Sequence, residues 1–157
     1  MFPTAWKRAI VKPLLKKKGL SLEMKNYRPI SNLTFLSKIL EKSALEQIMS
    51  HIENYNLLPA YQSAYRQNHG VETALLKMYN DLLHAVDNKQ VSIVVMIDLS
   101  AAFDTVDLPI VLNILQQDFK VSGTPLKWIK SYLSQRTMCV SINGTFTEPG
   151  DLLFGVP

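Results

Sequence analysis

The apolar run from Ser92 to Ile97 constrains the fold of this chain more than any other segment. It is a continuous, β-branched stretch bounded by polar residues, which is typical of a strand covered on both faces. Such a strand is the centre of a sheet packed against helices, so the run predicts an α/β or α+β fold. Asp98 follows the run directly, and we expect the buried strand to end at this carboxylate.

Helical periodicity flanks the run on both sides, because apolar residues recur there at the spacing of a helix face. The alternating segment Arg136–Ile142 predicts a further strand, and Asn143-Gly144 after it predicts a hairpin turn. The predicted helices are about Phe35–Glu53, Val71–Asn88, Leu108–Asp118 and Pro125–Leu133.

The N-terminal segment carries weaker signals. The apolar residues between Ala9 and Leu15 are interrupted by Pro13, which favours an extended segment or an edge strand. Asn26–Asn32 is rich in turn-forming residues, and its Pro29 biases the preceding residue toward extended geometry. No repeat or low-complexity stretch divides the chain.

Composition excludes several classes of protein. The chain has 157 residues, 47% hydrophobic and 19% charged, as in a globular domain. No apolar run has the length that crosses a bilayer, and the N-terminus lacks the pattern of a signal peptide. The single cysteine, Cys139, excludes an internal disulfide and a cysteine-based zinc cluster. We therefore expect a reducing intracellular compartment.

Positive charge is concentrated near the N-terminus. The formal net charge is +4, and eight of the 17 Lys and Arg residues lie between Lys7 and Arg28, where Glu23 is the only acid. Such a segment can neutralise phosphates of a nucleic acid. Charge alone favours the alternative, a solvated basic face that binds nothing specific.

Asp98 is the strongest candidate for a metal ligand or catalytic residue in the sequence. A carboxylate at the end of a buried strand is a suitable hard ligand for Mg²⁺. Asp98 or Ser100 can instead cap a short helix that runs through Phe103, and spacing alone favours this cap. His51, His69 and His84 have no ligand spacing, so we expect them to be exposed or locally bonded.

Several short segments follow one another in a recognisable order. They are Trp6–Lys18, Asn26–Ser31, Leu36–Lys42, Gln62–Arg66, Glu72–Leu75, the segment around Asp98, and Phe154–Pro157, which resembles the start of a G-V-P-Q-G-S box. In this order the chain resembles the reverse transcriptases of non-LTR (LINE-type) retrotransposons, especially the jockey and chicken-repeat groups. The resemblance implies the fingers (about residues 1–90) and part of the palm (about 91–157) of a polymerase.

The resemblance also implies chemistry. A complete enzyme of this kind copies an RNA template onto a DNA primer from dNTPs by a two-Mg²⁺ mechanism. It has no membrane partner, and it acts in the nucleus and cytoplasm. Asp98 matches the first of three metal-binding aspartates, and the carbonyl of Leu99 is a further ligand. Phe103 matches the aromatic gate that rejects a 2′-hydroxyl, and Ala102 next to it is implied to contact the nucleotide as well. Without the resemblance, Phe103 is expected to be an aromatic residue of the core.

The basic residues receive implied roles as well. Lys38 and Arg66 match positions that contact the incoming triphosphate, and Lys38 is otherwise a surface residue. Arg28 either joins them or pins the turn that contains it. The residues Lys16, Lys17 and Lys18 lie near the template or primer backbone, or form a solvated loop. For Asp104 and Asp107 we expect first-turn helix acids or structural acceptors rather than metal ligands.

The paired aspartates of the family's second catalytic motif have no counterpart in the sequence. With one of three carboxylates, Mg²⁺ binding is expected to be weak or absent, and the isolated chain is expected not to polymerise DNA. The strand before Asp98 is then expected to expose an apolar edge that promotes aggregation. The alternatives are a non-catalytic nucleic-acid-binding fragment and a decayed transposon product.

Overall fold

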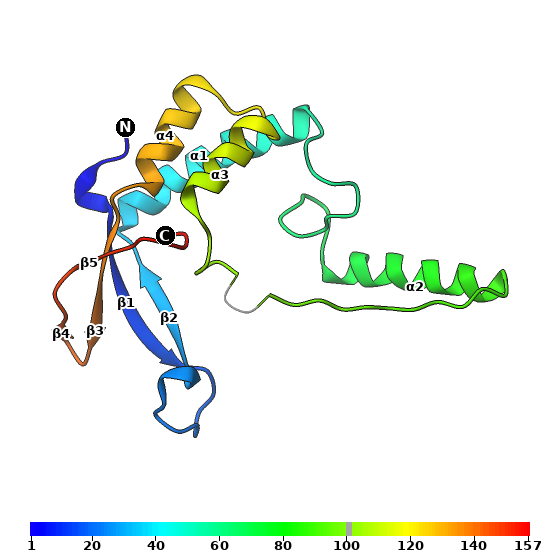
Figure 1. The fold of residues 1–157 in the computed structure, drawn as a ribbon, viewed down its shortest axis with the longest axis horizontal. Coiled ribbons are helices and arrows are strands. Elements are labelled where there is room, and N and C mark those ends of the chain that lie inside the picture. The colour runs from blue at the N-terminus through cyan, green and yellow to red at the C-terminus, as the bar shows by residue number, and fades with distance from the viewer. Residues whose placement is uncertain (100–101) are drawn as a thin grey trace. The chain divides into compact units, whose positions relative to one another are not determined.

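The computed structural model describes residues 1–99 and 102–157. The chain divides into two compact units, unit 1 with Met1–Tyr55 and Ala101–Pro157, and unit 2 with Asn56–Ser100. The fold is mixed α/β, as the sequence predicts, with a sheet and three α-helices in the described part of unit 1 and one α-helix in that of unit 2 (Figure 1). The division into fingers and palm stays a prediction.

Unit 1 is built on a five-stranded sheet in the order β2-β1-β3-β4, with β5 also paired to β3. The middle strand β1 is antiparallel to β2 and parallel to β3, so it joins the two ends of the chain. The strands are β1 (Arg8–Leu15), β2 (Tyr27–Asn32), β3 (Thr137–Ile142), β4 (Thr145–Phe146) and β5 (Gly150–Asp151).

Both predictions for the N-terminal segment are confirmed in part. Arg8–Leu15 is extended, as predicted, but it lies inside the sheet rather than at an edge. The extended geometry predicted before Pro29 is confirmed by strand β2, which takes the place of the turns expected in Asn26–Asn32. Both prolines are tolerated because of the register. The Lys16 amide donates to the Asn26 carbonyl (2.8 Å), and bonded pairs alternate along the ladder, so Pro13 and Pro29 face each other as a non-bonded pair. The pairing of β1 with β3 ends at Val11, so Pro13, which has no amide proton, does not have to donate a hydrogen bond to β3.

All four α-helices of the described residues confirm the sequence prediction to within a few residues, and two of them begin at a side-chain cap. Thr34 caps α1 by accepting the Ser37 amide, and Asp107 caps α3 by accepting the Ile110 amide. The helices are α1 (Phe35–Asn54), α2 (Val71–Asp87), α3 (Leu108–Gln117) and α4 (Gly123–Leu133). None of the helices in the described residues has the length and apolar character needed to span a membrane.

The core of unit 1 lies between its helices. Val121, Ile129 and Leu133 form a buried cluster, against which side chains of α1, α3 and α4 pack. At the N-terminus, Phe2 is buried and makes edge contacts with the rings of Trp128 and Tyr132. These contacts, together with the parallel pairing of β1 and β3, tie the first residues of the chain to α4.

The predicted hairpin turn is confirmed. Asn143 and Gly144 join β3 to β4 and both have positive φ angles, +49° and +84°. Two consecutive residues with positive φ angles are typical of the tight turn that Asn-Gly favours between antiparallel strands.

The predicted central strand before Asp98 is wrong. Residues 91–99 form an irregular segment of unit 2, and their apolar side chains are exposed, from 47% for Val94 to 93% for Val91. A β-branched run becomes a strand only where a neighbour completes its hydrogen-bond ladder, and none of the strands β1–β5 pairs with it. The predicted exposure of apolar surface is present, although without the strand.

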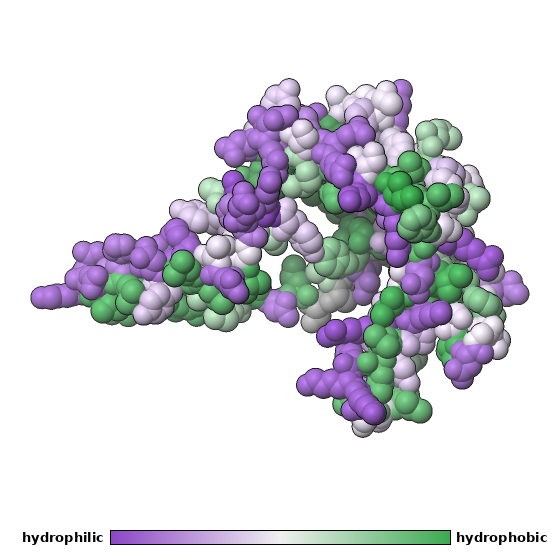
Figure 2. Space-filling model, turned by 180° about the vertical axis from the view of Figure 1, so that it is seen from behind, coloured by the Kyte–Doolittle hydropathy of each residue, from purple (hydrophilic) through white to green (hydrophobic). Residues whose placement is uncertain are grey.

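Helix α2 has a similar unpacked apolar side. Leu75, Tyr79 and Leu83 recur at helical spacing and are exposed. In the view of Figure 2, hydrophilic and hydrophobic side chains of the part at the left gather on opposite sides. Unit 2 therefore presents apolar surface on its helix and on residues 91–99 alike.

Candidate functional site

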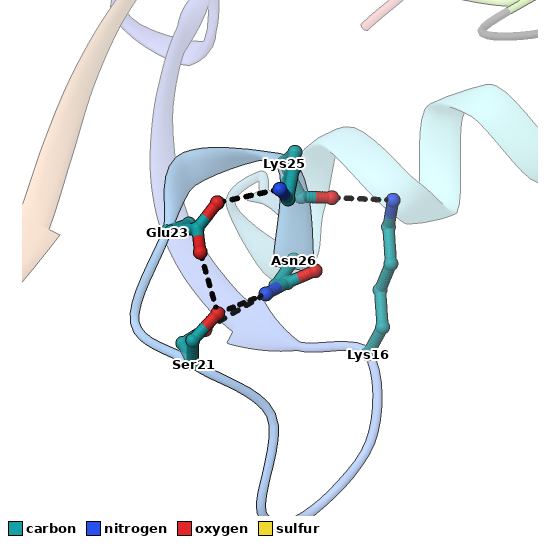
Figure 3. A network of polar contacts seen from close by, with 5 residues as sticks. All are labelled: Lys16, Ser21, Glu23, Lys25 and Asn26. Carbon is teal, nitrogen blue, oxygen red and sulfur yellow. Dashed lines mark hydrogen bonds and ion pairs between the residues drawn. The ribbon is translucent and has the colours of Figure 1, made fainter.

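The loop between β1 and β2 is held by a polar network (Figure 3). The Asn26 side-chain amide donates to the carbonyl and the hydroxyl of Ser21, both at 2.9 Å. The Lys16 ammonium donates to the Lys25 carbonyl at 2.7 Å. Lys25 itself forms an ion pair with Glu23 at 2.6 Å. Hydrogen bonds from Lys25 and then Ser21 lower the pKa of the Glu23 carboxyl. The network fixes the loop and occupies the charges of Lys16 and Lys25.

Lys17 and Lys18 lie in the same loop with a different environment. Both are exposed, and their ammonium groups have no hydrogen bond or ion pair with another described residue. Of the three consecutive lysines, these two are free to meet a phosphate, whereas Lys16 is anchored to its own loop.

The basic segment Lys7–Arg28 does not act as a single face. Lys7 is only 6% exposed, and its ammonium donates to the Ser134 carbonyl at 3.1 Å. Desolvation, and then the charge of Arg136, lower the pKa of Lys7. Lys7 is a structural residue, so it belongs neither to a phosphate-contacting segment nor to the solvated basic face that charge alone favours.

Arg8, Lys12 and Arg28 do share one face of the β1–β2 hairpin. Arg8 and Lys12 are four residues apart on β1, so their side chains lie on the same face of the sheet. Arg28 on β2 lies opposite Leu14, which shares that face, and is therefore a diagonal neighbour of Lys12. All three side chains are exposed. No hydrogen bond or ion pair joins the Arg28 guanidinium to another described residue, so it does not pin the turn.

The remaining basic candidates lie on different elements. Lys38 is exposed in the first turn of α1 in unit 1. Arg66 belongs to unit 2, where its guanidinium donates to the Pro59 carbonyl at 3.4 Å and leaves most of its donors unused. Their predicted contact with a triphosphate stays a prediction.

Asp98 and Leu99 end the irregular segment of unit 2. Both are exposed, and the Asp98 carboxylate has no hydrogen-bond or ion-pair partner in the part of the chain that the structure describes. The alternative cap at Ser100 lies outside the described residues. A helix through Phe103 is absent from residues 102–105, which form a turn.

Ala102 and Phe103 open the second half of unit 1. Both are exposed, with the Phe103 ring side chain 62% accessible, so the alternative role as a core aromatic is wrong. The backbone at this turn is held by the C-terminal segment. The Val156 amide donates to the Phe103 carbonyl at 3.1 Å, and the Gly155 amide donates to the Val106 carbonyl at 2.9 Å.

Acidic residues near this turn do not form a cluster. Asp107 caps α3 by accepting the Ile110 amide, which confirms the alternative of a structural acceptor, and Asp104 lies in the turn before it. Among the described residues, no group of three or more His, Cys, Asp or Glu side chains is placed to hold a metal ion. Asp98 thus fits Mg²⁺ as a single hard-oxygen ligand, and these residues do not by themselves fit a complete two-metal site.

The prediction of exposed or locally bonded histidines is wrong for His51, which is half-buried and lies 2.8 Å from the carbonyl of Phe119, a residue distant in sequence. It is confirmed for His69, which lies 2.8 Å from the Gln67 carbonyl, and for His84, which is exposed.

Sequence reasoning missed a buried polar cluster where β1 and β3 begin. Arg136 is 2% exposed, its Nε donates to the Tyr132 carbonyl at 2.6 Å, and its guanidinium lies over the rings of Tyr132 and Phe2. Burial lowers its pKa. Lys7 precedes β1 and Arg136 precedes β3, so the parallel register makes them neighbours. No local pattern signals a contact between residues so distant in sequence.

Comparison with known proteins adds independent information about this arrangement. Residues 15–154 match the family described as reverse transcriptase (RNA-dependent DNA polymerase). The chain is 30% identical over 156 residues to the RNA-directed DNA polymerase from mobile element jockey of Drosophila melanogaster. It is 28% identical over 156 residues to the probable RNA-directed DNA polymerase from transposon BS, and 29% over 157 residues to that from transposon X-element, both of the same organism. Each alignment covers 99% of this chain and 17% of the relative.

Proposed function

This chain belongs to the reverse transcriptase (RNA-dependent DNA polymerase) family, and from that premise we propose that it supplies part of the nucleotidyl-transfer site of a retrotransposon polymerase. The observation that carries the proposal is the extent of the match, which runs through residues 15–154 and includes Asp98 and Phe103. The proposed partners are an RNA template, a DNA primer and dNTPs.

Asp98 is the proposed metal ligand. Family membership implies a divalent metal in the full enzyme, and Mg²⁺ is our proposal because carboxylate and carbonyl oxygens are its preferred ligands. The exposed carboxylate of Asp98, which has no partner among the described residues, and the adjacent carbonyl of Leu99 supply two such groups. A complete site requires further carboxylates beyond these two groups.

The nucleotide itself meets two kinds of residue in this proposal. Phe103, with Ala102 beside it, lies under the sugar and excludes a 2′-hydroxyl, and its exposed ring is available for that contact. Lys38, Arg66 and Arg28 neutralise the triphosphate, for which an arginine fork offers paired donors.

RNA-templated primer extension by the natural protein that carries these residues tests the proposal. Asp98→Asn keeps the size of the side chain but removes its charge, so extension should fall by about a thousandfold or more. Asp87→Asn is the matched control, because it removes an exposed carboxylate of the same unit outside the proposed site. Equal extension by wild-type protein and the Asp98 variant would contradict the proposal.

A second function, nucleic-acid binding without catalysis, is favoured by the exposed face of Arg8, Lys12 and Arg28. Binding of single-stranded RNA by the 157-residue chain should weaken as salt rises. The double variant Lys12→Gln/Arg28→Gln should make the negative slope of log K against log salt shallower by about 1.4, or about 0.7 per lost phosphate contact. Lys127→Gln/Lys130→Gln on α4 removes the same charge elsewhere and should leave the slope unchanged. A slope that both pairs lower equally would show that only net charge matters.

A further inference from the structure

Gly155 touches the turn that carries Phe103. It is buried, and its φ angle is +86°. A Cβ at this position would lie 3.1 Å from the Phe103 carbonyl oxygen, 3.2 Å from the Asp104 Cα and 3.2 Å from the Asp104 carbonyl oxygen. All three atoms are backbone, so no flexible side chain can move away to make room. Only glycine fits without a shift of the turn.

The same contact is closed by two backbone hydrogen bonds, one on each side of the turn. The Gly155 amide donates to the Val106 carbonyl at 2.9 Å, and the Val156 amide donates to the Phe103 carbonyl at 3.1 Å. Together with the close approach of Gly155, these two bonds fix the backbone from Phe103 to Val106. We name this contact the Gly155 clamp.

The Phe103 ring has little else to fix its place. Its side chain is 62% exposed, and no ring contact joins it to another aromatic residue in the described parts of the chain. Its position therefore depends on the backbone of the turn rather than on side-chain packing. A change of a few tenths of an ångström in that backbone moves the ring with it.

We propose that Gly155 is a positioning residue for sugar selection: through the Gly155 clamp it sets where the Phe103 ring meets the nucleotide. This inference rests on the proposed function, in which Phe103 is the sugar gate. It adds a residue that acts only through another residue's backbone. A substitution at residue 155 would therefore change the selectivity between deoxyribose and ribose, while metal binding by the Asp98 carboxylate would be unaffected.

The chain provides a matched control for backbone strain. Gly144 has nearly the same φ angle, +84°, but a Cβ there would meet nothing within 4 Å. Gly144→Ala and Gly155→Ala therefore impose similar conformational strain. They differ in whether the new methyl group presses on another segment.

The clamp itself is tested in the 157-residue chain by amide hydrogen exchange. Gly155→Ala should speed exchange of the Val156 amide about tenfold or more, because the Phe103 carbonyl must move from its donor. Gly144→Ala should leave that amide unchanged. Unchanged exchange in Gly155→Ala would overturn the clamp.

Its role in selection is tested in the natural protein that carries these residues, by single-nucleotide extension with a dNTP and the matching rNTP. Gly155→Ala should lower the ratio of kcat/KM for dNTP over rNTP by about tenfold, whereas Gly144→Ala should retain it. An unchanged ratio in Gly155→Ala would overturn the positioning role. Absence of Asp98-dependent extension in the wild-type protein would instead overturn the proposed function, and sugar selection would fall with it, while the exchange result would still decide whether the clamp exists.

Discussion

At the scale of single residues, the strongest constraints lie in the cluster around Arg136. Its Nη1 and Nη2 atoms are buried and have no partner among the described residues. Each unpaired buried donor costs about 1–3 kcal/mol, which the contacts with the rings of Phe2 and Tyr132 offset only in part. Arg136 is therefore expected to order the N-terminus against α4 more than to stabilise the fold.

Tyr132 gives this cluster a pH dependence. Burial, and then the Glu41 carboxylate, raise the pKa of Tyr132 from 10.0 to about 12. Since the pKa is higher in the folded state, the stabilisation is complete below pH 10 and is lost as the pH rises toward 12. Between these values the free energy of unfolding should fall by at most about 2 kcal/mol, allowing for partial exposure of the ring.

Urea unfolding across this pH window checks the prediction. Tyr132→Phe should remove most of the decline, because phenylalanine has no proton to lose. Tyr79→Phe, which changes an exposed tyrosine of α2, should keep the wild-type decline. A Tyr132→Phe profile that still falls like the wild type would contradict the assignment.

At the scale of elements, agreement between sequence and structure follows the range of the signal. The helices and the Asn143-Gly144 turn were predictable because caps and periodicity lie within a few residues. The position of β1 between β2 and β3 was not, because its parallel partner lies at the other end of the chain. The prediction of a strand at Ser92–Ile97 was wrong for the same reason, because a strand needs a pairing partner that its own residues do not supply.

Helix α3 depends on its cap. Asp107 accepts the Ile110 amide at 3.1 Å, so Asp107→Ala should lower the free energy of unfolding by about 1 kcal/mol. Asp107→Asn should stay near the wild-type value, because asparagine also caps helices. Urea titrations followed by circular dichroism measure both. If the asparagine variant were as unstable as the alanine variant, the carboxylate would have a role other than capping.

At the scale of the whole molecule, the candidate site could be predicted only through ordered motifs. Those motifs identify Asp98, Phe103 and Arg66, but the spatial relation between unit 1 and unit 2 is not contained in any local pattern. The Gly155 clamp was equally hidden, since it depends on a close backbone approach between distant segments. Sequence thus identifies candidate residues, and the fold shows which of them are exposed or anchored.

The 157-residue chain is predicted not to extend a primer. Its described residues supply no group of three or more metal-binding side chains, and a polymerase needs several carboxylates to hold two ions. Primer extension on an RNA template with Mg²⁺ measures this directly. Magnesium-dependent product from the purified chain would contradict the prediction.

Metal exchange in an Asp98→Cys variant of the natural protein tests the proposal that the Asp98 carboxylate binds the catalytic metal. A thiolate is a poor ligand for hard Mg²⁺ and a better one for softer divalent ions. Within these 157 residues the one cysteine, Cys139, is buried and does not compete for the added ion. We expect extension by Asp98→Cys to be lost with Mg²⁺ and partly restored with Mn²⁺ or Cd²⁺, while Asp87→Cys behaves as the wild type. Full activity of Asp98→Cys with Mg²⁺ would contradict the proposal.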